Sequence, residues 1–129
     1  MTEYVTLDDL MAAARRLLGD DVAVRDVGLL MAAVARPQQS AFGADAYPDR
    51  DSKAAALLHS VVKNHALIDG NKRLGWLAVN LFYGYNGFEL VVDEDTAYDL
   101  VMGVASGRHD DVGEIATILA RWVRPLRLP

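Results

Sequence analysis

A basic cluster stands inside an acidic chain, in the stretch NHALIDGNKRLGW at residues 64–76. The 129-residue sequence has a net charge of −5 and only three lysines, yet this stretch brings Lys72 and Arg73 into the first turn of a predicted helix. The helix dipole disfavours a cation there by about 0.3–1 kcal/mol. A bound anion reverses the effect, because free backbone N–H groups and two cations together bind phosphate. The cluster therefore favours a phosphate site over a solvated Lys–Arg pair.

Two neighbours of the cluster have side chains suited to phosphate chemistry. His65 follows Val61 and Val62 at helical spacing, so we expect it at the end of a helix, on the apolar face. It is either a core histidine satisfied by hydrogen bonds or a neutral imidazole that takes a proton from a hydroxyl. Asp69 is either a turn residue or a carboxylate ligand for Mg²⁺. Asn71 is also a plausible N-cap for the next helix.

Other kinds of site find no support in the sequence. There is no cysteine, which excludes disulfides, a thiolate nucleophile and metal thiolates. His59 and His109 are not spaced with His65 in a zinc-ligand pattern. The sequence also contains no G-x-x-x-x-G-K-[ST], G-x-G-x-x-G or G-x-S-x-G motif.

Apolar periodicity, caps and turn residues predict an all-α fold of about six helices in a single domain, residues 1–129. The expected helices span residues 7–18, 26–36, 51 or 52–67, 71–85, 94–105 and 111–124, with a short extended piece near 88–92. The helix over 71–85 is apolar almost all round, which predicts a central position. This helix and the one before it flank the basic cluster.

The segment PQQSAFGADAYPDR, residues 37–50, lacks periodicity. Loops of this length are uncommon in compact domains and are often functional or disordered. Phe42 and Tyr47 provide side chains that can pack, so we expect an ordered flap.

Composition limits the class of protein. The chain is 52% hydrophobic and 24% charged, which is typical of a globular domain. A pI near 5.0 argues against direct nucleic-acid binding. The N-terminus lacks the pattern of a signal peptide, and no apolar run approaches the ~20 residues that span a bilayer. We therefore expect a cytoplasmic protein that does not bind membranes.

The stretch HALIDGNKR resembles the signature of the Doc (death-on-curing) branch of the Fic/Doc superfamily, H-x-F-x-D-[AG]-N-K-R. Six positions match the signature: His65, Asp69, Gly70, Asn71, Lys72 and Arg73. Leu67 departs from it, because the pattern has Phe there. The segment ARPQQSAFGADAYPD is similar to the Doc flap, and the helix ending at Asn86 and Gly87 also fits. Chain length and helix order agree over the whole sequence.

The resemblance implies a toxin of a toxin–antitoxin pair that transfers the γ-phosphate of a nucleoside triphosphate, such as ATP, to a threonine of elongation factor Tu and arrests translation. It implies that His65 is the general base and that Asp69 holds Mg²⁺. Gly70, Asn71, Lys72 and Arg73 would bind the triphosphate, and Lys72 would also assist catalysis. The flap would align the target peptide. A Phd-like antitoxin would bind as a helix in a surface groove near the site.

Two alternatives to a kinase remain open. The wider Fic family transfers a nucleoside monophosphate with H-x-F-x-[DE]-G-N-G-R-x-x-R. Here Lys72 replaces the second glycine and Trp76 replaces the second arginine. These departures favour γ-phosphate transfer over nucleotidyl transfer. An inactive Doc-like binding module is a further alternative, although the presence of His65, Asp69 and Lys72 together argues against it.

Overall fold

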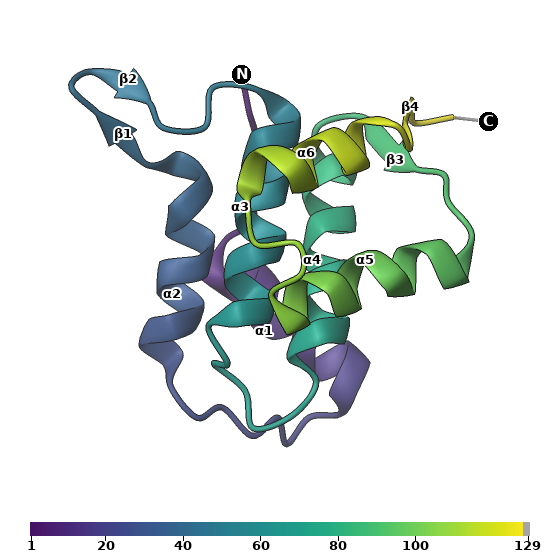
Figure 1. Ribbon diagram of the computed structural model, residues 1–129. Coiled ribbons are helices and arrows are strands. Elements are labelled where there is room, and N and C mark those ends of the chain that lie inside the picture. The colour runs from purple at the N-terminus through teal and green to yellow at the C-terminus, as the bar shows by residue number, and fades with distance from the viewer. Residues whose placement is uncertain (128–129) are drawn as a thin grey trace.

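Helices dominate the structure, a computed structural model that describes residues 1–127 (Figure 1). The six α-helices within these residues are α1 Leu7–Leu18, α2 Val27–Ala35, α3 Arg50–Lys63, α4 Asn71–Tyr85, α5 Glu94–Ser106 and α6 Val112–Ala120. A 3₁₀-helix and two small antiparallel sheets accompany them: η1 Arg36–Gln38, β1 Ser40–Ala41 with β2 Ala44–Asp45, and β3 Phe88–Leu90 with β4 Val123–Pro125. The predicted all-α class is confirmed.

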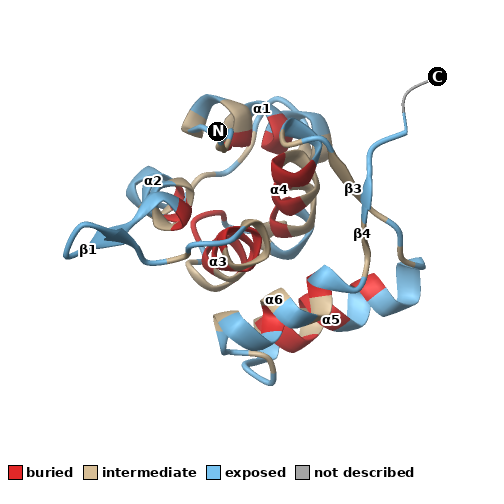
Figure 2. Cartoon of the chain, turned by 90° about the horizontal axis from the view of Figure 1, so that it is seen from above, coloured by how far each residue is buried: buried red, intermediate tan, exposed pale blue. Residues whose placement is uncertain are grey.

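α3 and α4 form a helical hairpin at the centre of the fold. Figure 2 shows buried residues along both helices, with α1 and α2 on one side and α5 and α6 on the other. Gly75 allows the two helices to approach closely, because a Cβ atom there would lie 2.6 Å from Cγ2 of Val62. Each fully buried Val, Leu or Phe side chain of this core contributes about 1.5–3 kcal/mol. The loop between α3 and α4 carries the basic cluster and is therefore held by the most buried part of the molecule.

A buried hydroxyl also ties α4 to the start of α3. Tyr83 is fully buried, and its O–H donates to Oδ1 of Asp51 at 2.8 Å. Burial raises the pKa of Tyr83 far above its usual value, with the bond to Asp51 acting in the same direction. The phenol consequently stays protonated and remains a donor.

Two helices have the bounds that the sequence predicts. α1 begins after Thr6, whose hydroxyl accepts from Asp9 N while the Asp9 carboxylate accepts from Thr6 N, which completes a capping box. α4 spans the predicted 71–85. α1 has an apolar stripe, α4 is largely apolar, and clear stop signals follow them at Gly19 and at Asn86, so local chemistry fixes their ends.

The start of α3 differs from the prediction. The N-cap is Asp49 rather than Asp51 or Ser52, because the Asp49 carboxylate accepts from Ser52 N at 2.8 Å and the Ser52 hydroxyl accepts from Asp49 N at 3.3 Å. All three residues have side chains that can serve as the N-cap of a helix, and they lie within four positions of the chain. The reciprocal pair is the one that forms, because it satisfies two backbone N–H groups at once.

The last helix is shorter than predicted, since α6 ends at Ala120 rather than near Arg124. The chain then turns into β4, in which Val123 pairs with Leu90 of β3. Trp122, expected on the apolar face of the helix, instead packs edge-on against Trp76 with ring centroids 6.4 Å apart. Pairing with β3 replaces the last turn of the helix, and this long-range contact has no local signal.

The longest of the helices within residues 1–127 is α4, with 15 residues. No helix in this part of the chain is long and apolar enough to cross a membrane.

Candidate functional site

His65 lies outside the helix that was expected to carry it. α3 ends at Lys63, Asn64 is its C-cap, and His65 takes a left-handed backbone conformation with φ 53°. Its side chain is exposed, so the expectation of a buried position on the apolar face was wrong. A non-glycine residue at positive φ costs on the order of 1–2 kcal/mol and persists only where other contacts hold it. The site loop, residues 64–70, must therefore be supported from elsewhere.

A second segment supplies that support. Residues 23–26, between α1 and α2, pair with the site loop through an isolated antiparallel bridge at Val24 and Leu67. Three backbone hydrogen bonds join the same two segments: Arg25 N to Ala66 O at 2.8 Å, Asp26 N to Ala66 O at 3.1 Å and Ile68 N to Ala23 O at 3.0 Å. The guanidinium of Arg25 donates in addition to the carbonyl of His65. The backbone of the loop is thus fixed by another loop.

Asn71 holds the same loop from the other side. Its Oδ1 accepts from Leu67 N and its Nδ2 donates to Leu67 O, both at 3.0 Å. Leu67 is buried, as expected for the position where the Doc signature has Phe. Asn71 is the first residue of α4 and not its N-cap, which corrects the capping prediction. Since both ends of its amide are occupied, Asn71 offers a ligand its backbone N–H.

The N-cap of α4 is Gly70, with φ 92°. A Cβ atom at this position would lie 2.6 Å from Cδ1 of Leu18, so the close approach of α1 adds to the backbone requirement for glycine. Glycine has no side chain that could cap the helix. Within residues 1–127, no side chain caps the free N–H groups at the start of α4.

Lys72 and Arg73 extend into solvent from this uncapped turn. Neither forms a salt bridge or a side-chain hydrogen bond with any other residue in 1–127. Two unpaired cations beside free N–H groups and the positive end of a helix dipole are mutually unfavourable. An anion bound at this turn would remove the penalty.

Asp69 stands immediately before the helix, with its side chain exposed. Its Oδ1 accepts from Gly70 N at 2.8 Å, and among residues 1–127 no hydrogen bond reaches its other oxygen. No group of three or more potential metal ligands gathers within the described chain. A single carboxylate still suits Mg²⁺, which takes one or two carboxylates together with substrate phosphates and water.

One cavity, of about 380 Å³, brings all the predicted site residues together. Its lining includes His65, Asp69, Gly70, Asn71, Lys72 and Arg73. Val62, Ile68 and Ala105 complete the wall, so α5 also contributes. The arrangement places an imidazole, a carboxylate and two cations around one cavity. Such a set can accept a proton, hold a divalent cation and neutralise phosphate charge.

A second and larger hollow, of about 570 Å³, adjoins the first through Lys72 and Arg73. We call it the α4–α5 groove, because most of its lining comes from those helices: Trp76, Leu77, Asn80, Glu94, Ala97, Tyr98, Val101 and Met102, with Leu17 from α1. The lining is mainly apolar. Trp76 belongs to this groove and not to the smaller cavity.

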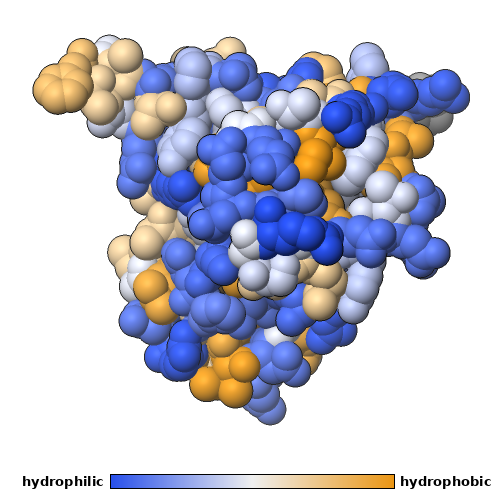
Figure 3. Space-filling view, in the orientation of Figure 1, coloured by the Kyte–Doolittle hydropathy of each residue, from blue (hydrophilic) through white to orange (hydrophobic). Residues whose placement is uncertain are grey.

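The flap is ordered, as predicted, and forms the β1–β2 hairpin. Tyr47 anchors its base: the Tyr47 hydroxyl accepts from Arg36 Nε at 2.8 Å, and the ring lies 5.5 Å from that guanidinium. Phe42 does not pack, contrary to expectation, and is fully exposed at the tip with φ 53°. Figure 3 shows this apolar end projecting at the upper left.

The hairpin also lies away from the site. It precedes α3, whereas the site loop follows α3, and 14 residues at ~1.5 Å rise separate them by about 21 Å. Figure 1 shows the hairpin at the upper left and the loop between α3 and α4 at the bottom. No residue of the hairpin lines the site cavity. The hairpin therefore does not belong to the wall of the cavity that contains His65, and alignment of a target peptide by the flap stays a prediction.

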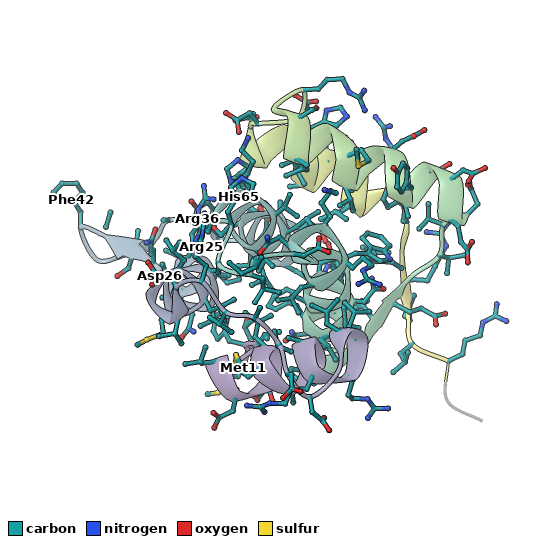
Figure 4. All side chains as sticks on the ribbon, turned by 90° about the horizontal axis from the view of Figure 1, so that it is seen from below. Met11, Arg25, Asp26, Arg36, Phe42 and His65 are labelled. Carbon is teal, nitrogen blue, oxygen red and sulfur yellow. The ribbon has the colours of Figure 1, made fainter. Side chains whose placement is uncertain are left out.

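Sequence reasoning missed the contribution of residues 23–26. The alternation of Val22 and Val24 is a weak signal for an extended piece, and nothing local indicates its partner. Figure 4 shows Arg25, Asp26 and His65 on one side of the molecule, with Phe42 at the end of the projecting hairpin.

Comparison with known proteins identifies the family to which the chain belongs. The sequence matches the Fic/DOC family over residues 4–83, a region that includes α3, the site loop and most of α4. It is 49% identical over 122 residues to a protein named Toxin Doc from Mycolicibacterium smegmatis, with 93% of each chain covered. The matched length therefore extends beyond the signature to nearly the whole fold. The chain belongs to the Doc branch of the Fic/DOC family.

Proposed function

We propose that this protein is a Doc-like toxin that phosphorylates a threonine or serine hydroxyl of a translation factor, with elongation factor Tu as the expected target. The observation that carries the proposal is the single cavity in which His65, Asp69, Lys72 and Arg73 meet at the uncapped start of α4. Family membership and similarity to a Toxin Doc support the same role.

His65 acts as the general base in this proposal. The hydroxyl oxygen of the target attacks the γ-phosphorus, its proton passes to the His65 imidazole, and the nucleoside diphosphate leaves as the bond to the γ-phosphorus breaks. Exposure keeps the imidazole accessible to a protein substrate. The base must be held within hydrogen-bond reach of the hydroxyl, so the fixed backbone of the site loop matters for the rate.

Lys72, Arg73 and the free N–H groups of α4 bind the triphosphate and neutralise charge on the transferring group. Asp69 would hold Mg²⁺, which would supply positive charge against the phosphates. Asp69→Asn keeps the acceptor for Gly70 N but is a much weaker ligand for a hard dication. We expect this variant to need more Mg²⁺ or to lose activity, measured as rate against Mg²⁺ concentration. An unchanged Mg²⁺ dependence would leave Asp69 as a turn residue.

Transfer of the γ-phosphate is favoured over transfer of a nucleoside monophosphate. Lys72 occupies the position where nucleotidyl transferases of the wider family have glycine, so a long cation fills space open to a phosphate there. Trp76 replaces their second arginine, and its ring packs on Trp122 instead of facing the cavity. One phosphate pocket is thus filled and one ligand is absent, which favours a triphosphate bound with its terminal group towards His65.

The test is intact mass spectrometry of purified elongation factor Tu after incubation with the protein, Mg²⁺ and ATP. We expect a mass increase of one phosphate, label from γ-labelled and none from α-labelled nucleotide, and no modification by His65→Ala. Label from α-labelled nucleotide alone would instead identify nucleotidyl transfer. No label on elongation factor Tu or on any protein of a bacterial lysate would favour an inactive binding module.

The toxin role has its own test. Expression of the chain alone should arrest bacterial growth by stopping protein synthesis, and co-expression of a cognate Phd-like antitoxin should restore growth. Normal protein synthesis at confirmed expression of folded protein would contradict the toxin role.

The α4–α5 groove suits the helix of such an antitoxin. Its lining is mainly apolar, which suits the apolar face of an amphipathic helix, while Lys72 and Arg73 at the end near the site can pair with acidic side chains. Tyr98 is 63% exposed in this groove, which makes Tyr98→Glu an informative variant. We expect it to weaken antitoxin binding in calorimetry while transfer continues. Unchanged binding would place the antitoxin elsewhere.

A further inference from the structure

We propose that Arg25 is a positioning residue for His65. Its guanidinium donates to the His65 carbonyl, and in doing so holds the main chain of His65 in the left-handed conformation that aims the imidazole into the cavity. The inference rests on the proposed function only in taking His65 as the base. The geometric part, that Arg25 fixes His65, stands on its own.

His65 has fewer hydrogen bonds than the residues that follow it in the site loop. The peptide groups of residues 66–68 are held by backbone atoms of residues 23–26 and by the Asn71 amide. His65 itself makes one hydrogen bond within residues 1–127, and the donor is Arg25. The backbone of His65 is therefore fixed by a single hydrogen bond from one side chain, whereas several hydrogen bonds fix the backbone of residues 66–68.

The backbone of His65 is strained. A histidine at φ 53° would relax towards a negative φ if nothing opposed it. Rotation about this bond moves the peptide plane on the carbonyl side and the direction of the Cβ atom. A hydrogen bond to that carbonyl opposes the rotation directly. Loss of the bond is therefore expected to misdirect the imidazole without unfolding the loop.

An arginine side chain suits this position. Arg25 is exposed and forms no salt bridge with any residue in 1–127, although Asp26 is adjacent. The Asp26 carboxylate instead accepts from Gly28 N at 2.9 Å as the N-cap of α2. The planar guanidinium has several N–H donors in fixed directions and can reach the His65 carbonyl. The backbone N–H of Arg25 donates at the same time to Ala66 O. The residue joins two adjacent carbonyls of the site loop.

The kinetic test compares Arg25→Ala and Arg25→Lys with Arg121→Ala, a matched exposed arginine at the end of α6. Misplacement of a base by an ångström costs up to about 100-fold in rate. We expect Arg25→Ala to lower kcat roughly 10- to 100-fold with KM for ATP within about twofold, because the phosphate ligands are untouched. Arg25→Lys should recover part of the loss, and Arg121→Ala should match wild type. Wild-type kcat in folded Arg25→Ala would overturn the proposal.

A second readout does not depend on activity. The chain has three histidines, so the ring and amide signals of His65 can be assigned in NMR spectra with His65→Gln as reference. Arg25→Ala should shift the His65 signals and leave those of His59 and His109 in place. Unshifted His65 signals would overturn the positioning role whatever the reaction. Shifted signals in a protein without transfer activity would support positioning while contradicting the proposed function.

Discussion

The site loop and the β1–β2 hairpin are both irregular connections between helices, and each contains a non-glycine residue at φ 53°. In the site loop this residue is His65, and in the hairpin it is Phe42. The surroundings differ completely. The loop is joined to residues 23–26 by a β-bridge and backbone hydrogen bonds, whereas the hairpin tip projects into solvent.

The difference shows two ways of imposing one backbone conformation. At Phe42 the cause is local, because Phe42 and Gly43 are the two loop residues between paired strands and such tight hairpins require positive φ at both positions. At His65 the cause is tertiary, because the contacts come from another part of the chain. Backbone strain that is maintained by distant contacts can contribute to a functional site, because the same contacts also fix the direction of the side chain.

The largest expected contrast is in catalysis. His65→Ala should lower transfer about 10²–10⁴-fold, the contribution of a positioned general base. The free energy of unfolding should change little, because the side chain is exposed. Phe42→Ala should retain wild-type kcat, since the hairpin does not line the cavity. If Phe42→Ala lowered the transfer rate by a comparable factor, the hairpin would also take part in the reaction, and the contrast between the two regions would be wrong.

The next contrast is in stability. Leu67→Ala removes a buried side chain that anchors the site loop, and we expect a loss of about 2–5 kcal/mol in the free energy of unfolding. Phe42→Ala removes a fully exposed side chain and should change stability by less than about 0.5 kcal/mol. Urea unfolding of both variants measures the difference. Equal effects would mean that the loop is not anchored through Leu67.

A smaller effect is expected at Asn71. Asn71→Ala leaves the N–H and carbonyl of Leu67 without their side-chain partners, at a cost of about 1–3 kcal/mol. Asn71→Asp keeps the acceptor for Leu67 N and loses the donor, so it should fall between alanine and wild type. If the alanine variant kept full stability, water would be replacing the amide at no cost.

The smallest effect distinguishes the two strained residues themselves. Glycine at either position removes the strain of a positive φ, but it also increases the conformational entropy of the unfolded chain. The two effects oppose each other, so His65→Gly and Phe42→Gly should each change the free energy of unfolding by about 1 kcal/mol or less. Thermal unfolding measures both. Stabilisation at Phe42 alone would indicate that the contacts around His65 already compensate its strain.

Sequence reasoning succeeded where structure depends on adjacent residues. The bounds of α1 follow from its capping box and apolar stripe, those of α4 follow from its flanking turn residues and apolar run, and the six site residues lie within one signature over residues 65–73. It failed where distant segments meet. Helical periodicity continues past Lys63 to Leu67, yet pairing with residues 23–26 ends the helix at Lys63. In the same way Val123 joins β3 instead of prolonging α6. No local pattern encodes either partner.

The contact between residues 23–26 and the site loop determines what fraction of the molecules can catalyse the reaction at any moment. Arg25 and His65 are 40 residues apart in the chain, and residues 20, 21, 23, 25 and 26 are exposed, so their separation uncovers little apolar surface. The observed rate is then the intrinsic rate multiplied by the fraction of molecules in which the loops are joined. Amide exchange at Ile68, whose N–H bonds Ala23 O, reports that fraction directly.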